Sequence, residues 1–145
     1  MKILVLNGPN INMLGIREPG IYGKQTFADL LALLQQTALE EKVTVDQYQS
    51  NHEGCLVDKI QEALGVYDGI VINPAVYTHT SVAILDALKA VSIPAVEVHI
   101  SNVDARESFR QISYAGMACV HTVKGQGLDG YRQAIVYLKE HYGIA

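Results

Sequence analysis

Short apolar runs alternate with helix-periodic segments five times along the 145-residue chain. Residues 2–7, 69–73 and 95–100 are apolar almost throughout rather than at every second position, a pattern typical of parallel strands that are covered on both faces. Further strands are predicted over 43–50 and 117–123. Because consecutive parallel strands need a crossover connection, this order of elements excludes most folds other than layered α/β architectures.

The segments between the runs have apolar residues at helical spacing. Helices are predicted over 26–42, 56–64, 106–112 and 128–142, and a further helix, capped by Thr78 or Thr80, continues to residue 91. Right-handed crossovers then give an α/β fold, a flavodoxin-like three-layer sandwich with a five-stranded parallel sheet in the order 2-1-3-4-5. Residues 1–145 are expected to form a single catalytic domain, since this length suits one hydrophobic core.

Charge and cysteine usage narrow the class of protein. Eleven Lys and Arg against 15 Asp and Glu give a net charge of −4 without a basic cluster, which argues against nucleic-acid or membrane partners. The first apolar run, about six residues long, is too short for a signal peptide or a membrane span. Cys55 and Cys119 lie far apart and lack metal-type spacing. A cytoplasmic protein is therefore predicted.

The longest irregular segment follows the first strand. Residues 8–25 contain four glycines and two prolines, and neither a helical nor a strand period survives them. A loop of this length is usually functional, and this one leaves the carboxyl end of a buried strand, where ligands bind in open α/β sheets. It carries Arg17 and Tyr22, a cation and a phenol. The segment is interpreted as an active-site lid.

Polar side chains also follow three of the predicted strands: Asn7 and Asn10, Asn73, and the pair Glu97 and His99. The fold would bring these strand ends together at one edge of the sheet. Glu97 and His99 are two residues apart on a strand and so share a face, where the carboxylate can orient the imidazole. The alternative is a buried ion pair without a catalytic role. The shared position at the strand ends favours function.

The predicted third helix offers two further candidates. His79 lies at its start, where free backbone N–H groups suit an anion or a hydroxyl-rich ligand, although a histidine there is often only solvated. Asp86, seven residues later, lies on the same helical face but about 10 Å further along. It cannot easily reach a ligand of His79. Asp86 is either surface charge or faces a neighbouring subunit.

Several site classes are excluded by the motifs that are lacking. There is no His-x-x-x-His or Cys-x-x-Cys spacing for a metal, and Arg17 and Arg110 would repel a cation. The third strand ends in Asn73 rather than the aspartate of a receiver domain. No Gly-x-Gly-x-x-Gly follows the first strand, and no phosphate-binding Gly-Lys-Ser/Thr occurs. No cofactor or metal is predicted.

These motifs together resemble the type II 3-dehydroquinate dehydratases, in order and over nearly the whole chain. The segments that carry the resemblance are 7–10, 17–19, 22–23, 49–54, 72–74, 77–81, 97–102 and 106–110. The main departure is Ala75-Val76, where the family pattern has Gly-Ala. The resemblance implies dehydration of 3-dehydroquinate to 3-dehydroshikimate by anti elimination through an enolate, without metal or cofactor, in the shikimate pathway or in quinate catabolism.

The resemblance also implies roles for individual residues. Tyr22 would be the base, held anionic by Arg17, and His99 the acid that protonates the departing hydroxyl, while Asn10 would stabilise the enolate. Asp86 would reach in from a neighbouring subunit of a trimer, four trimers making a dodecamer. The residues that would hold the substrate are Asn73, His79, Ile100, Ser101 and Arg110. The competing interpretation is a non-catalytic flavodoxin-like module that binds a flavin or a nucleotide.

Overall fold

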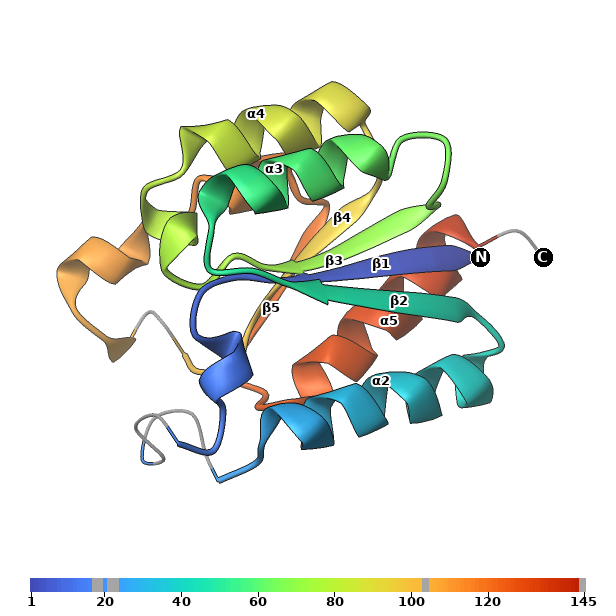
Figure 1. Ribbon diagram of the computed structural model, residues 1–145, viewed down its shortest axis with the longest axis horizontal. Coiled ribbons are helices and arrows are strands. Elements are labelled where there is room, and N and C mark those ends of the chain that lie inside the picture. The colour runs from blue at the N-terminus through green and yellow to red at the C-terminus, as the bar shows by residue number, and fades with distance from the viewer. Residues whose placement is uncertain (17–19, 21–23, 103–104, 144–145) are drawn as a thin grey trace.

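The computed structural model describes residues 1–16, 20, 24–102 and 105–143 (Figure 1). The strands of this part of the chain form one parallel sheet in the order β2-β1-β3-β4-β5, which confirms the predicted fold class. In chain order they are β1 (Lys2–Asn7), β2 (Thr44–Gln49), β3 (Gly69–Asn73), β4 (Ala95–His99) and β5 (His121–Lys124).

Helices cover both faces of the sheet, so the molecule has three layers. In Figure 1 α3 and α4 lie above the sheet, and α2 and α5 lie below it. The bounds are α2 (Phe27–Glu41), α3 (Glu53–Glu62), α4 (Val82–Val91) and α5 (Asp129–Tyr142). Short 3₁₀ turns gather mostly at the carboxyl ends of the strands: η1 (Ile11–Met13), η2 (Ala75–His79), η4 (Ser108–Gln111) and η5 (Ala115–Ala118). None of the described helices is long and apolar enough to cross a membrane.

Each face of the sheet has its own core, because side chains alternate along every strand. Ile3, Val5 and Val71 pack against α2 and α5, whereas Leu4 and Ile70 pack against α3 and α4. All five side chains are almost completely buried. Burial of an aliphatic side chain of this size stabilises the fold by about 1.5–3 kcal/mol, so the two cores hold the strand ends in a fixed arrangement.

The start of α2 agrees with the sequence pattern. Thr26 is the N-cap, its hydroxyl accepts the backbone N–H of Asp29, and the Asp29 carboxylate accepts the backbone N–H of Thr26. This reciprocal capping box satisfies two backbone donors that the helix would otherwise leave unpaired. It fixes the point at which the chain enters α2 after the 8–25 segment.

The cap of α4 differs from the prediction. The N-cap is Ser81, whose hydroxyl accepts the backbone N–H of Ile84 at 2.9 Å. Thr78 cannot serve, because its buried hydroxyl contacts the side chains of Glu97 and Ser113. His79 is consequently the last residue of η2 rather than the first residue of the helix.

The last strand is also shorter than predicted. The segment 117–123 was expected to be extended, but residues 115–118 form η5 and β5 begins only at His121. The backbone N–H of Gly116 donates to Ser113 Oγ, and a Cβ there would lie 3.1 Å from the Glu97 carboxylate. The turn η5 therefore packs against Glu97. The strand that pairs with β4 begins only after this turn, at His121. A helix was also predicted over 106–112, but only Ser108–Gln111 of this segment form a turn, the 3₁₀ turn η4.

Candidate active site

A cavity of about 160 Å³ opens beyond the carboxyl ends of β1, β3 and β4. This is the edge of the sheet to which the topology of an open α/β fold directs ligands. Its lining combines asparagine amides, imidazoles and guanidinium groups with a few apolar side chains. The lining residues are Pro9, Asn10, Ile11, Asn73, Ala75, Val76, His79, His99, Ile100, Ser101, Arg106 and Arg110.

Most of the residues predicted for the site meet in this cavity. Those that line it are Asn10, Asn73, His79, His99, Ile100, Ser101 and Arg110. Glu97 lies behind His99, and Asp86 is an exposed residue of α4 outside the lining. The predicted base Tyr22 and its partner Arg17 lie outside the described residues, as do residues 18, 19, 21 and 23 of the predicted lid.

The pair Glu97 and His99 is the most ordered part of the cavity. His99 Nε2 lies 2.8 Å from Glu97 Oε1, and both side chains are nearly inaccessible to solvent. Because Nε2 faces the carboxylate, it carries a proton, and the other ring nitrogen is Nδ1. The described part of the chain gives Nδ1 no hydrogen-bond partner. The imidazole is thus oriented by Glu97 and presents Nδ1 to a ligand.

Glu97 is held as a carboxylate. Burial alone would raise the pKa of this carboxyl, but hydrogen bonds from His99, Ser113 and Thr78 more than offset that effect and place the pKa below its ordinary value. The hydroxyl of Ser113 donates to Oε2 at 2.5 Å, and that of Thr78 does so at 3.3 Å. A charged Glu97 is therefore maintained next to His99 throughout the neutral range.

This arrangement predicts acid-sensitive stability. A carboxyl with a lowered folded-state pKa stabilises the fold above its unfolded-state pKa, and that contribution disappears as the pH falls through the folded-state pKa. Glu97→Gln should lower the free energy of unfolding by about 2 kcal/mol at pH 7, a typical value for hydrogen bonds to a charged group. Urea titrations at pH 7 and below pH 4 should show the difference from the parent shrinking in acid. A difference that does not change with pH would contradict the ionised state of Glu97.

His79 comes to the cavity from η2. Its Nδ1 lies 2.7 Å from the carbonyl oxygen of Ile112, so Nδ1 donates and Nε2 is left as an acceptor. Burial lowers the pKa of the imidazole, and the nearby charges of His99 and Arg110 lower it further, although the Ile112 carbonyl acts in the opposite sense. A neutral His79 can accept a hydrogen bond from a ligand hydroxyl.

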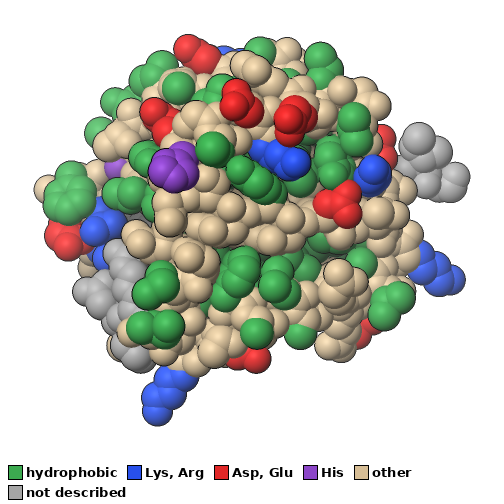
Figure 2. Space-filling model, in the orientation of Figure 1, with side chains coloured by type: hydrophobic (Ala, Val, Ile, Leu, Met, Phe, Trp, Pro, Cys, Tyr) green, Lys and Arg blue, Asp and Glu red, His purple; other side chains and the backbone are tan. Residues whose placement is uncertain are grey.

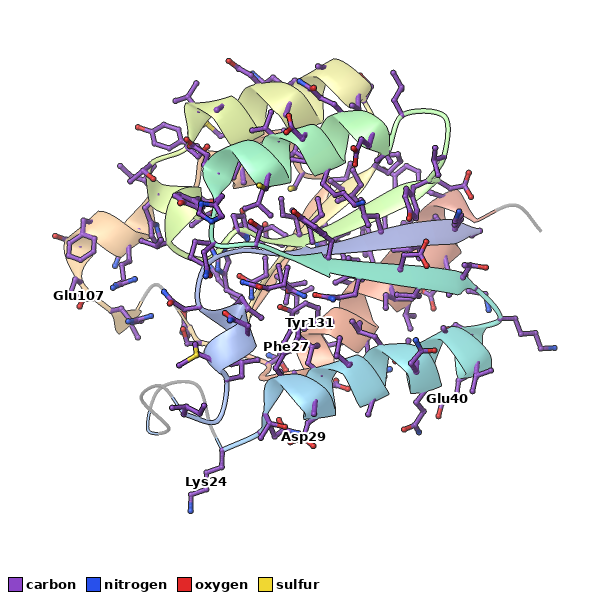
Figure 3. All side chains as sticks on the ribbon, in the orientation of Figure 1. Lys24, Phe27, Asp29, Glu40, Glu107 and Tyr131 are labelled. Carbon is purple, nitrogen blue, oxygen red and sulfur yellow. The ribbon has the colours of Figure 1, made fainter. Side chains whose placement is uncertain are left out.

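Two arginines give the cavity its positive charge. Arg110 Nε donates to Glu107 Oε2 at 2.6 Å, and Arg106 Nε lies 3.9 Å from the same oxygen. Glu107 is exposed and lies at the outer edge of the molecule in Figure 3. The guanidinium groups therefore line the cavity while their shared carboxylate stays in solvent. An anionic ligand would be attracted to this side of the cavity.

The chains leaving β1 and β3 are in direct contact at the base of the cavity. Gly8 donates its N–H to the carbonyl of Asn73 at 2.8 Å, and a Cβ at Gly8 would lie 2.5 Å from the carbonyl oxygen of Pro74. Only glycine permits this approach. Asn10 follows in a left-handed conformation with φ of 69°, which places it at the start of η1.

The family model described as dehydroquinase class II matches residues 1–139. The chain belongs to this family. A 3-dehydroquinate dehydratase from Endomicrobium trichonymphae is 55% identical over 92% of this chain and 94% of its own length. A catabolic 3-dehydroquinase from Verticillium alfalfae is 52% identical over 97% of this chain and 93% of its own. The crystal structure of a type II dehydroquinase from Butyrivibrio crossotus is 53% identical, with a TM-score of 0.94 over 96% of this chain and 97% of that one.

One position departs from the family pattern that the sequence suggested. Ala75 has a φ of 53°, the left-handed region that favours glycine, and its side chain lines the cavity. The expected glycine thus has a conformational reason. In this class II dehydroquinase Ala75 adopts the left-handed conformation although it has a Cβ. Its backbone N–H donates a hydrogen bond to Asn73 Oδ1.

Arg106 is a cavity residue that the sequence reasoning missed. It lies four residues before Arg110, and the two guanidinium groups meet at the same cavity. The spacing was visible in the sequence, since residues four apart share a side of a helical turn. Without the fold, however, a second arginine there could not be distinguished from surface charge. Thr78 and Ser113, whose hydroxyls donate to Glu97, were missed for the same reason.

Proposed function

We propose that this class II dehydroquinase removes water from 3-dehydroquinate to give 3-dehydroshikimate. The single observation that carries the proposal is the imidazole of His99, oriented by Glu97, facing a cavity with two arginines. An elimination needs an acid at the leaving hydroxyl, and an anionic substrate needs cations. The family and the names of the relatives support the same reaction and do not favour a flavin- or nucleotide-binding module.

The reaction then divides between two groups. Tyr22, as a phenolate, takes the proton next to the ketone, and the electron pair moves to the carbonyl oxygen as an enolate that Asn10 stabilises. When the ketone re-forms, the electrons make the new C=C bond and expel the hydroxyl. His99 supplies the proton that turns this hydroxyl into water. No electron is gained or lost, and residues of the chain supply the base, the acid and the partner of the enolate, so we propose that the chain needs no metal or cofactor.

The remaining polar groups hold the substrate. Arg110 provides charge, neutral His79 and Asn73 pair with hydroxyl groups, and the segment at Ile100 and Ser101 closes the side of the cavity beside His99. Arg106 adds a second cation to the same wall.

The direct test is the appearance of a conjugated enone when purified protein is mixed with 3-dehydroquinate. Ultraviolet absorbance follows it, and the assay is repeated with a strong metal chelator. We expect undiminished turnover in the chelator. An inactive protein would overturn the proposed function, and activity abolished by the chelator would overturn cofactor independence. A flavin absorption band in the purified protein would support the binding-module alternative. Both relatives' names, dehydratase and catabolic dehydroquinase, correspond to this one reaction.

We also propose that the site is completed between subunits of a trimer, four of which form a dodecamer. Asp86 is exposed and lies one helical turn beyond exposed Val82 on α4. Apolar Val76, Phe109 and Ile112 are likewise exposed on η2, η4 and the residue after η4, next to the cavity. Figure 2 shows hydrophobic side chains at the surface on the left of the view, the side on which η4 lies in Figure 1. A second copy packed here would bury these side chains and bring its Asp86 to the neighbour's cavity.

Both cysteines are free thiols, which fits a cytoplasmic location.

Subunit mixing tests the shared site. Asp86→Ala and Arg17→Ala should each lose activity, and a mixture should recover part of it, because hybrid trimers contain some sites with both residues intact. Mass labelling first establishes that subunits exchange. With exchange established, a mixture as inactive as its components would contradict the shared site, as would an active monomer in sedimentation.

A further inference from the structure

A buried tyrosine outside the cavity connects two strand ends. Tyr131 belongs to α5 and has no solvent-exposed surface. Its hydroxyl donates to Asn7 Oδ1 at 2.6 Å and accepts from Asn73 Nδ2 at 2.9 Å. Asn7 and Asn73 are neighbours in register at the ends of β1 and β3. In Figure 3 the Tyr131 label lies in the interior of the view, below the sheet.

The direction of every hydrogen bond in this network is fixed by its neighbours. The backbone N–H of Ala75 can only donate, so the group of Asn73 that faces it is Oδ1, at 3.0 Å. Asn73 Nδ2 must then face Tyr131, whose own proton goes to Asn7 Oδ1. Asn7 Nδ2 in turn donates to Gln47 Oε1 at 3.0 Å. A flipped Asn73 amide would place two donors face to face at Ala75.

Asn73 is the member of the network that reaches the cavity. A carboxamide nitrogen has two N–H groups. One of those of Asn73 donates to Tyr131, and the second remains for another acceptor. Since the amide is planar, a partner on its oxygen and a partner on its nitrogen determine where this second N–H lies. The orientation of the donor that a ligand would meet is therefore set by a residue of α5.

We propose that Tyr131 is a positioning residue, which holds the Asn73 amide in the one orientation that binds a substrate hydroxyl; this rests on the proposed function. A phenylalanine would fill the same apolar space between Leu34, Ile135 and the sheet. The hydroxyl adds a desolvation cost that only the two amide bonds offset. Burial raises the pKa of Tyr131, so the phenol keeps the proton that it donates to Asn7.

Tyr131→Phe tests the proposal. It should lower kcat/KM roughly tenfold, with most of the loss in KM, because an amide without its partner is free to turn away from the substrate. Tyr67→Phe is the matched control. Tyr67 lies just before the amino end of β3, and its hydroxyl donates to Asp46 Oδ2 at 2.6 Å. Activity should not change in this variant. Ile135→Val, on the same buried side of α5, controls for loss of stability alone.

A double-mutant cycle separates positioning from a general structural role. If Tyr131 acts through Asn73, then adding Tyr131→Phe to Asn73→Ala should lower kcat/KM by less than twofold further. Two losses that multiply would overturn the proposal. The proposal would also be overturned if Ile135→Val lowered the melting temperature as much as Tyr131→Phe and lowered kcat/KM by the same factor.

A readout that does not depend on the substrate keeps this test apart from the proposed function. The side-chain amide protons of Asn73, identified in NMR spectra by their loss in Asn73→Ala, should exchange with solvent at least tenfold faster in Tyr131→Phe than in the parent. Unchanged exchange would overturn the proposal even in an active enzyme. If the parent fails to convert 3-dehydroquinate but exchange accelerates as expected, the proposed function is wrong and the positioning of Asn73 stands.

Discussion

Tyr22→Phe is expected to lower kcat by about 10²–10⁴ while substrate binding is retained, since this is the usual contribution of a general base. The proton to be removed is next to a ketone and needs a strong base, and a phenolate is stronger than a carboxylate. A free tyrosine has a pKa of about 10, so little of it is ionised at pH 7. A cation within about 4–6 Å stabilises the phenolate by about 1–3 pKa units, the role proposed for Arg17.

Turnover and binding are measured separately for this variant. Steady-state kinetics give kcat, and calorimetric titration with a non-reacting substrate analogue gives the affinity, which should stay within a few fold of the parent. Tyr142→Phe, an exposed tyrosine at the end of α5, is the control for the same chemical change. A Tyr22→Phe protein with more than about a tenth of the parent's activity would rule out Tyr22 as the base.

His99→Ala is expected to have the second largest effect, a fall in kcat of about 10²–10⁴, because the hydroxyl would leave without a proton. The parent's kcat/KM should decline on the alkaline side, where an acid has lost its proton, and this limb should be missing in the variant.

Added imidazole provides a sharper test of the same role. His99 is almost completely buried and lines the cavity, so its removal leaves space beside Glu97 that a free imidazole can enter. Rescue that rises with the concentration of imidazolium supports a proton donor at this position. His121→Ala, an exposed histidine of β5, should behave as the parent. A variant with a full alkaline limb and no response to imidazole would show that His99 is not the acid.

The parts of the site that follow from local periodicity were predictable. Glu97 and His99 share a strand face, and Asn73 ends a strand that the topology places beside β1, so their meeting needed only the fold. The cap of α4 was not predictable, because the hydroxyl of Thr78 donates to Glu97, a residue of β4 that is 19 positions away in the sequence. Tyr131 looked like any apolar member of a helical stripe. Its two amide partners lie 58 and 124 residues away in the sequence.

The contact between Gly8 and Pro74 limits how this site can be redesigned. A backbone that already approaches another backbone without room for a single methyl group cannot be moved closer, and the hydrogen bond from Gly8 to Asn73 resists moving it apart. Directed evolution toward bulkier substrates should therefore leave this backbone contact unchanged and collect its substitutions on another wall of the cavity. That wall, at Arg106 and Arg110, is built from a short 3₁₀ turn and the residues before it rather than from the sheet.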